Sequence, residues 1–185
     1  MDVIRAINQR RAYRSLEHVK ITKDLIRDLA RSAQLAPSCF NNQPARFVFV
    51  SDFKLLKEMR AALSKGNEWA FSASMIIAVF SKRKDDCIIK DREYHQFDCG
   101  LAVGFLLLRA TELGLVAHPI AGFSPKKTKE ILDIPDEYKV ITLIIVGRHS
   151  KKISPILSKK QVELEKKRPE RFALKKVAHF NRFKK

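Results

Sequence analysis

Three short apolar segments, separated by helix-like stretches, set the strongest limit on how this chain can fold. They cover residues 47–50, 75–80 and 140–146, and none of them contains a charged residue. Runs of this length, rich in Val, Ile and Phe, are typical of strands that are buried on both faces. Because predicted helices lie between them, we expect a layered α+β or α/β domain in which helices pack on a mixed sheet.

The helices are marked by capping residues and by apolar spacing. Asp2 can cap a helix that runs to about residue 9, with Ile4 and Ile7 on one face. Thr22 precedes a second helix, which should end before Pro37 because the residue before a proline disfavours the α conformation. Further helices are expected over residues 53–63, 92–113, from 125 onward and 158–167.

Glycines and prolines separate these elements. Gly114 should end the longest helix, and Gly100 and Gly104 lie on one of its faces, where they permit close packing. Residues 118–122 are predicted to form a turn-rich connection. No internal repeat or low-complexity linker precedes residue 150. We therefore expect residues 1–150 to form the core and residues 151–185 to add a basic helix and arm to the same domain.

The positive charge of the chain is concentrated near its C-terminus. The formal net charge is +17, and from residue 150 to 185 Lys and Arg outnumber Asp and Glu by 13 to 3. Such a segment is either a solvated basic surface or a site that holds phosphate groups, and composition alone leaves both interpretations open.

The sequence shows neither a targeting segment nor a membrane segment. Charged residues interrupt the first twelve positions, and the most apolar stretch, residues 100–108, is far shorter than the ~20 residues that span a bilayer. The cysteines Cys39, Cys87 and Cys99 have no CxxC spacing, and scattered thiols suit a reducing compartment. We therefore expect a cytoplasmic protein without a membrane partner.

Sequence motifs of several common sites are missing. The chain has no GxGxxG and no GxxxxGK[ST], so neither a Rossmann fingerprint nor a P-loop is predicted. The five histidines show no HExxH or other ligand spacing, so no metal site is expected either.

Three polar clusters remain that a folded core does not require. They are the arginines of residues 10–14, the amide-rich loop 37–44 between two prolines, and the basic arm around residues 168 and 171. Arginines can pair with a phosphate, and side-chain amides can hydrogen-bond a planar heterocycle, so together they suit a nucleotide-like cofactor. Taken singly, the arginines can be solvated and the amides can satisfy the backbone of turns.

The combination of these clusters resembles the FMN-dependent nitroreductase family, and the resemblance extends over nearly the whole chain. The segments that carry it are RRAYRS at 10–15, APSCFNNQPARFVFV at 36–50, GN at 66–67, DCGLAVGFLLLRATELGL at 98–115, HPIAGF at 118–123, VITLIIVGRHS at 140–150 and RFALKKVAHFNRF at 171–183.

The resemblance implies an α+β fold, with a mixed, mainly antiparallel sheet flanked by helices. It also implies a homodimer in which a C-terminal arm is exchanged and two FMN molecules lie at the subunit interface. NADH or NADPH would reduce the flavin in a ping-pong cycle, and a small acceptor such as a nitroaromatic compound or a quinone would reoxidise it. Flavin N5 carries the hydride, so no catalytic side chain is implied.

The family's cofactor contacts can be transferred to matching positions in this sequence. The resemblance implies that the first arginine cluster meets the phosphate, the ribityl chain and the pyrimidine edge. The polar loop would approach the flavin from the partner subunit, and the amide at residue 67 would lie at its N3/O4 edge. The implied cofactor-binding residues are Arg10, Arg11, Ala12, Arg14, Pro37, Ser38, Cys39, Asn41, Gln43, Asn67, Pro119, Ile120, Ala121, Gly122, Arg168 and Arg171.

Three alanines depart from the family pattern. Ala12 stands where a hydroxyl residue is usual, Ala45 replaces a common tryptophan, and Ala121 replaces a glutamate whose contact can run through the backbone amide. These departures leave the physiological acceptor open.

Two other functions compete with this interpretation. One is a flavin-binding family member with a sensory role or a different chemistry. The other is a basic nucleic-acid-binding protein, which the sequence disfavours because most phenylalanines lie in apolar runs instead of alternating with cations. We therefore expect no nucleic-acid partner.

Overall fold

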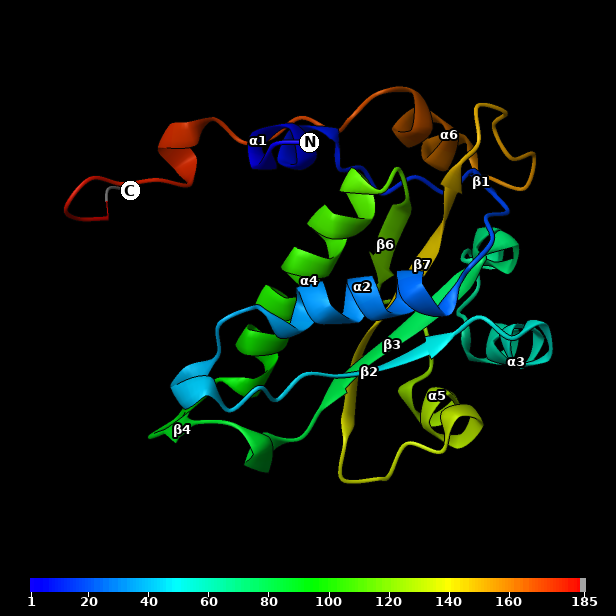
Figure 1. Ribbon diagram of the computed structural model, residues 1–185. Helices are drawn as coiled ribbons and strands as arrows, with labels where there is room; N and C mark the ends of the chain where they lie inside the picture. The colour runs from blue at the N-terminus through cyan, green and yellow to red at the C-terminus, as the bar shows by residue number, and fades with distance from the viewer. Residues whose placement is uncertain (184–185) are drawn as a thin grey trace.

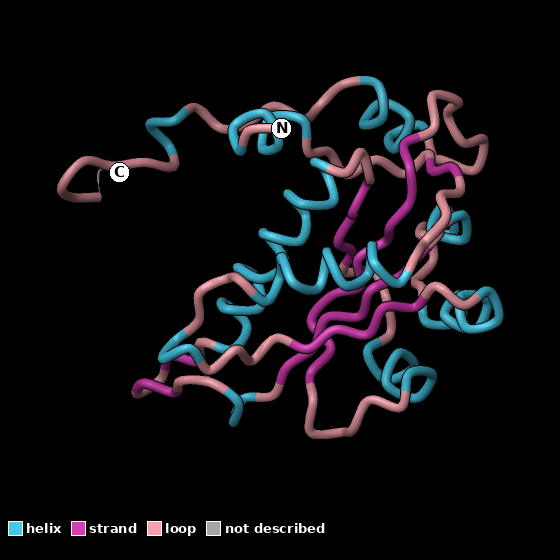
Figure 2. Tube along the Cα trace, in the orientation of Figure 1, coloured by secondary structure: helices cyan, strands magenta, loops and turns pink. Residues whose placement is uncertain are grey.

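The computed structural model describes residues 1–183 (Figures 1 and 2). Six helices and seven strands follow one another along this part of the chain. They are α1 (Val3–Gln9), β1 (Leu16–Glu17), α2 (Lys23–Gln34), β2 (Arg46–Val50), α3 (Phe53–Met59), β3 (Met75–Ser81), β4 (Ile88–Ile89), β5 (Arg92–Glu93), α4 (His95–Glu112), β6 (Val116–Ile120), α5 (Pro125–Leu132), β7 (Lys139–His149) and α6 (Lys159–Lys166).

The main sheet is built around β3 and β7, the two longest apolar segments. β2 pairs with β3, β3 pairs with β7, and both β6 and β1 pair with β7, every pair being antiparallel. Ile77 lies opposite Phe49 on one side and opposite Ile144 on the other. β4 and β5 form a separate two-stranded ribbon. The mainly antiparallel sheet expected from the sequence is confirmed.

Helices cover both faces of the sheet, which explains why its central strands are apolar throughout. On one face, Ile76 and Leu143 belong to a core that includes side chains of α3 and α5. On the other face, Ile77 and Ile144 belong to a core that includes Leu29 of α2 and side chains of α4. Figure 1 shows α2 and α4 crossing in front of the sheet. This α+β layering agrees with the fold class predicted from the sequence.

Several helix boundaries follow the capping residues. The side chains of Asp2, Thr22 and Ser124 each accept a hydrogen bond from a backbone amide in the first turn of α1, α2 and α5. The helix predicted for residues 92–113 begins later, at His95, because Arg92 and Glu93 pair with β4. The predicted helix 53–63 ends at Met59 and continues as a 3₁₀ turn over Arg60–Ala62.

The prediction of a turn over residues 118–122 is wrong for most of that segment. Residues 116–120 form β6, which pairs only with β7 in the described part of the chain. Proline lacks an N–H group, so Pro119 is tolerated in a strand with a free edge. The extended conformation is set by pairing with β7, whose partner residues lie 23 to 31 positions further along the chain.

Two expectations about small side chains also need correction. Among residues 1–183, nothing lies within 4 Å of a Cβ built on Gly100 or Gly104, so these glycines make no close packing contact with this part of the chain. Cys39 and Cys87, expected as thiols, form a disulfide whose α-carbons are 6.0 Å apart. A separation of 48 residues gives no local spacing signal for such a pair. Cys99 is free and buried, and burial raises the pKa of its thiol to about 11.

The C-terminal arm runs away from the sheet and its helices (Figure 1). Its apolar side chains are between 62% and 86% exposed, namely those of Phe172, Leu174, Val177, Phe180 and Phe183. Across residues 1–183, no helix combines the length and the apolar character needed to cross a bilayer.

Candidate functional site

The first arginine cluster and the C-terminal basic segment meet in the folded chain. Arg10, Arg14, Arg168 and Arg171 line one cleft of about 210 Å³. Arg168 is held across the end of α1, because its guanidinium donates to the carbonyl oxygens of Asn8 at 2.6 Å and of Arg10 at 2.7 Å.

The cleft of about 210 Å³ is electropositive. The pKa of Arg10 is lowered by burial and by the positive charges of Arg168 and Arg171. Three cations that repel one another around a cleft form a site that an anion would stabilise. Ala12 also lines this cleft, and as an alanine it contributes no hydroxyl group to it.

Arg11 is committed to the packing of α6. Its guanidinium donates to the carbonyl oxygens of Leu164 at 2.8 Å and Glu165 at 3.1 Å, and to the hydroxyl of Tyr13 at 3.0 Å. It therefore stabilises the last carbonyls of the helix in the way expected of a basic residue at a helix C-terminus. Any contact of Arg11 with a cofactor would have to share these hydrogen bonds.

Glu165 fixes the backbone at the end of the first arginine cluster, at residues 14 and 15. Its two carboxylate oxygens accept hydrogen bonds from the backbone amides of Arg14, at 2.7 Å, and Ser15, at 3.1 Å. The carboxylate is buried. Charge-assisted bonds of this kind are stronger than neutral ones, so Glu165 ties α6 to residues 14 and 15 across about 150 positions of sequence.

The cleft of about 210 Å³ is connected to Asn67 and Gly122 through Arg14 and Trp69. The Arg14 guanidinium lies over the indole ring of Trp69, 5.8 Å from its centroid. The indole N–H donates to Oδ1 of Asn67 at 3.1 Å, and Nδ2 of Asn67 donates to the carbonyl of Gly122 at 2.9 Å. A Cβ built on Gly122 would collide with Nδ2 of Asn67, so a larger residue here would displace this amide from its present position.

His118 joins β6 to the same group of residues. Its ring stacks on Trp69 with centroids 4.7 Å apart, and its Nδ1 lies 3.1 Å from the carbonyl oxygen of Tyr13. A carbonyl can only accept, so Nδ1 carries the hydrogen. Burial lowers the pKa of His118 to about 4, and the charges of Arg14 and Arg10 act in the same direction. His118 is therefore neutral at pH 7.

The low pKa of His118 predicts a loss of stability in mild acid. The folded state binds fewer protons than the unfolded state between pH 6.5 and pH 4, so the free energy of unfolding falls as the pH decreases through this range. We expect a loss of about 2 kcal/mol from pH 7 to pH 5 through this group. His118→Asn keeps an N–H donor but cannot titrate, and should lack this part of the loss in denaturant unfolding. The control is His18→Asn at an exposed histidine. Equal pH slopes in wild type and His118→Asn would contradict the prediction.

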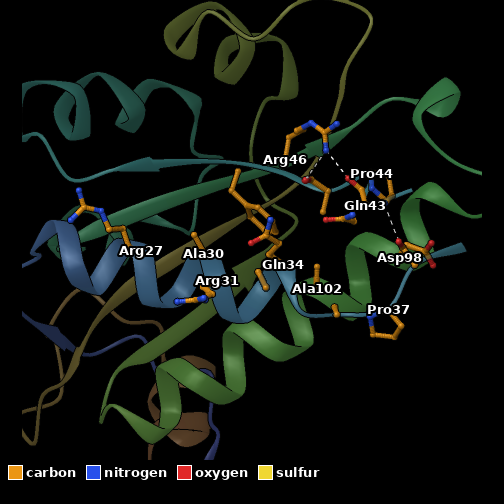
Figure 3. A pocket seen from close by; sticks show the side chains of 15 residues that line it. Arg27, Ala30, Arg31, Gln34, Pro37, Gln43, Pro44, Arg46, Asp98 and Ala102 are labelled. Carbon is orange, nitrogen blue, oxygen red and sulfur yellow. Dashed lines mark hydrogen bonds between the residues drawn. The ribbon is translucent and has the colours of Figure 1, made fainter. Parts of the chain in front are cut away.

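The polar loop 37–44 lies apart from the arginines within one chain. In Figure 1 the loop is near β4, whereas residues 10–14 follow α1 near the opposite end of the molecule. Pro37, Ser38 and Gln43 help to line a different cavity of about 600 Å³. Figure 3 shows Arg27, Arg31 and Gln34 of α2, and Asp98 and Ala102 of α4, around this cavity.

The structure thus brings together four of the five segments that sequence reasoning selected. These are residues 10–14, 67, 119–122 and 168–171, and the loop 37–43 is the exception. Sequence reasoning missed Glu165, Trp69 and His118 as parts of this site. An acidic residue in a strongly basic segment was a signal that could have drawn attention to Glu165. Its hydrogen-bond partners could not be identified from the sequence, because they lie about 150 positions away.

Comparisons with known proteins identify the family and the fold of this chain. The sequence model of the nitroreductase family matches residues 7–68 and 59–148. An oxygen-insensitive NADPH nitroreductase of Helicobacter pylori is 25% identical, covering 85% of this chain and 92% of that protein. An iodotyrosine deiodinase of Haliscomenobacter hydrossis is 28% identical, covering 76% of this chain and 76% of that protein.

A solved structure shares the fold over most of both chains. It is described as an oxidoreductase containing FMN, superposes with a TM-score of 0.83 and is 28% identical, covering 97% of this chain and 91% of that chain. The family match spans most of the sequence, including the first arginine cluster, the loop 37–44 and all of the main sheet except the last residue of β7. The chain belongs to the nitroreductase family.

Proposed function

We propose that this protein is an FMN-dependent oxidoreductase that passes electrons from NADH or NADPH to a small acceptor such as a nitroaromatic compound or a quinone. The observation that carries the proposal is the cleft at Arg10, where the neighbouring charges of Arg168 and Arg171 are also positive. When FMN is bound, its flavin supplies the hydride chemistry at N5. The chain itself would bind and orient the cofactor.

The cleft lined by Arg10, Arg14, Arg168 and Arg171, here called the arginine cleft, suits a phosphate monoester in its charge and in its hydrogen-bond donors. A phosphate group carries nearly two negative charges at neutral pH, and arginine presents a planar fork that matches its oxygens. Arg10, Arg168 and Arg171 would hold the phosphate, and Arg11 would support them through its hydrogen bonds to the carbonyl oxygens of α6. The charge repulsion among the three arginines would be relieved by the bound anion.

Arg14, Asn67 and residues 119–122 would hold the ring system. Arg14 is half-buried beside Trp69, so its cation acts in a medium of lower dielectric than water. A cation near flavin N1 and O2 raises the reduction potential. Asn67 already uses its amide toward Trp69 and Gly122, so a contact with the flavin would share these hydrogen bonds.

We propose that the working unit is a homodimer. The loop 37–43 would then contact the flavin bound mainly by the partner, because within one chain it lies far from the arginine cleft (Figure 1). Exposed apolar residues are available for such an interface: Phe97 and Phe105 on α4, and the side chains of the C-terminal arm. A cytoplasmic location also remains a prediction.

The purified protein tests the cofactor and the donor directly. We expect a yellow protein that releases FMN, and not FAD, when it is denatured. NADH or NADPH should bleach the flavin absorbance without oxygen, and a quinone or nitroaromatic compound should restore it. A colourless protein that cannot be reconstituted with FMN, but binds duplex DNA in a salt-dependent manner, would favour the nucleic-acid alternative.

A further inference from the structure

The loop 37–44 adopts a backbone conformation that its sequence does not favour. Phe40, Asn41 and Gln43 all have positive φ angles, of 47°, 58° and 50°. Asparagine tolerates this region, but for phenylalanine and glutamine it is uncommon. Phe40 is also 88% exposed, so the packing of its side chain does not stabilise this backbone conformation. Such a conformation persists only where the surroundings fix it.

Both ends of the strained segment are fixed by neighbouring groups. The backbone amide of Cys39 donates to Oδ2 of Asp98 at 2.7 Å, and the amide of Gln43 donates to Oγ of Ser38 at 2.9 Å. Arg46 donates to the carbonyl of Gln43 at 2.6 Å. The covalent connection is the disulfide from Cys39 to Cys87, a residue directly before β4.

The buried carboxyl group of Asp86, beside the disulfide, has only one of its two oxygens hydrogen-bonded by residues 1–183: Oδ1 accepts from the backbone amide of Cys87 at 2.8 Å. Oδ2 of Asp86 accepts no hydrogen bond from the described part of the chain, although Asp86 is only 8% exposed. The two sulfurs and a carboxylate oxygen of Asp86 all lie within 4.8 Å of one another. Nδ2 of Asn42 donates to Oδ1 of Asp86 at 3.3 Å and lies 3.5 Å from the sulfur of Cys87.

A second carboxyl group, that of Asp98, makes the surroundings of the disulfide suitable for holding a proton. Burial raises the pKa of Asp98, and the nearby Asp86 raises it further, against the opposing hydrogen bond from the Cys39 amide. Thiol–disulfide exchange requires a proton to move on and off each sulfur. Asp86 and Asp98 provide carboxyl groups for this purpose. Cys39 and Cys87 are half-buried, which leaves them open to a small reagent, whereas Cys99 is fully buried.

We propose that Cys39 and Cys87 form a thiol–disulfide exchange site that takes a dithiol as reductant and that controls the conformation of the loop 37–44. One thiolate of the dithiol attacks a sulfur of the pair, the bond between Cys39 and Cys87 breaks, and the leaving sulfur takes a proton for which Asp86 is placed. The second thiol of the reductant then displaces the other cysteine. The dithiol leaves as a disulfide, and Cys39 and Cys87 have gained two electrons and two protons.

Reduction would release the strain of the loop, because the remaining contacts named above are hydrogen bonds, and those of Gln43 are exposed to solvent. The consequence for FMN rests on the proposed function, in which this loop contacts the flavin. The exchange site itself does not depend on that function, so the two can be tested separately.

Counting thiols in the full-length, flavin-free protein tests the exchange site. After oxidised glutathione and a chelator we expect one reactive thiol per denatured chain, and after dithiothreitol three, as the sequence has three cysteines. The double variant Cys39→Ser with Cys87→Ser should give one thiol in both states. Cys99→Ser should give none and then two. Three thiols in the oxidised wild type, with or without a bound zinc ion, would overturn the proposal.

Cleavage by chymotrypsin after Phe40 reports the loop conformation without FMN. We expect the reduced protein to be cut there at least about 10-fold faster than the oxidised protein, because local opening controls proteolysis. The double serine variant should be cut at the fast rate in both states. Equal rates in oxidised and reduced wild type would show that the disulfide does not control the loop, and would overturn that part of the proposal.

Two further measurements test the proton transfer by Asp86 and, separately, the contact between the loop 37–44 and the flavin. Asp86→Asn should slow reduction by about 10-fold or more at equal concentration of dithiothreitol thiolate, with the thiol count unchanged. An unchanged rate at equal thiolate concentration would refute the role of Asp86. If thiol counts and cleavage behave as expected but FMN affinity is the same in both states, the exchange site stands and the flavin contact of the loop is wrong.

Discussion

A chain that ends at Lys167 is expected to purify as a colourless monomer. The truncation removes Arg168, Arg171 and the five exposed apolar side chains of the arm, but retains α6 and its contacts with Arg11, Arg14 and Ser15. The core and main sheet should therefore still fold. If each apolar side chain is buried on a second copy, it contributes about 1.5–3 kcal/mol before the ordering cost. Five of them would dominate a dimer interface.

Sedimentation and absorbance of the truncated protein at low micromolar concentration provide the test. Two point variants separate the roles of the arm. Arg171→Ala should bind FMN more weakly and remain dimeric, whereas Arg182→Ala, at an exposed cation further along the arm, should change neither property. A truncated protein that stays dimeric and yellow would show that the arm is a solvated tail.

Replacing Arg10 with alanine is expected to weaken FMN binding without weakening the fold. A hydrogen bond to a charged group contributes about 1.5–3 kcal/mol, which corresponds to about 10- to 150-fold in the dissociation constant. The charges of Arg168 and Arg171 beside Arg10 are both positive, so removing the Arg10 guanidinium relieves repulsion in the flavin-free protein. The melting temperature of the apoprotein should therefore be unchanged or higher. FMN binding is therefore expected to weaken while the stability of the apoprotein is maintained or raised.

Titration of the apoprotein with FMN, combined with thermal unfolding, measures both effects. Arg10→Lys should recover only part of the affinity, because a point charge lacks the planar fork of arginine. Arg5→Ala removes an exposed arginine from α1 and is the matched control. Unchanged FMN affinity in Arg10→Ala would contradict its assignment to the phosphate. A parallel fall in affinity and melting temperature would mean that Arg10 supports the fold instead.

Signals confined to a few neighbouring residues were sufficient for the main elements of the fold. The continuous apolar runs of β3 and β7 indicated buried strands, and the caps Asp2, Thr22 and Ser124 marked the starts of three helices. Their types could be predicted because helix caps and apolar spacing act within a few residues. The two-residue strand β1 and the strand β6 with its proline carry no such pattern, and their conformation depends on pairing with β7.

The candidate site could be predicted in its residue types but not in its connections. Arg10, Arg168 and Arg171 were selected from the sequence, and their roles toward FMN remain predictions. Their meeting in one cleft depends on α6, which is held against residues 14 and 15 by Glu165. Nothing near Glu165 in the sequence indicates that contact. The same holds for Trp69 between Arg14 and His118.

The sequence by itself determined the helix caps, the buried strands, the basic C-terminal segment and the polar residues available to a cofactor. The tertiary structure alone decided that Cys39 bonds Cys87, that His118 is buried and neutral, and that the loop 37–44 lies far from the arginine cleft within one chain (Figure 1). The reason is physical. Periodicity and capping are short-range properties of the backbone, whereas disulfide pairing, desolvation and charge clustering depend on groups that come together only when distant segments pack.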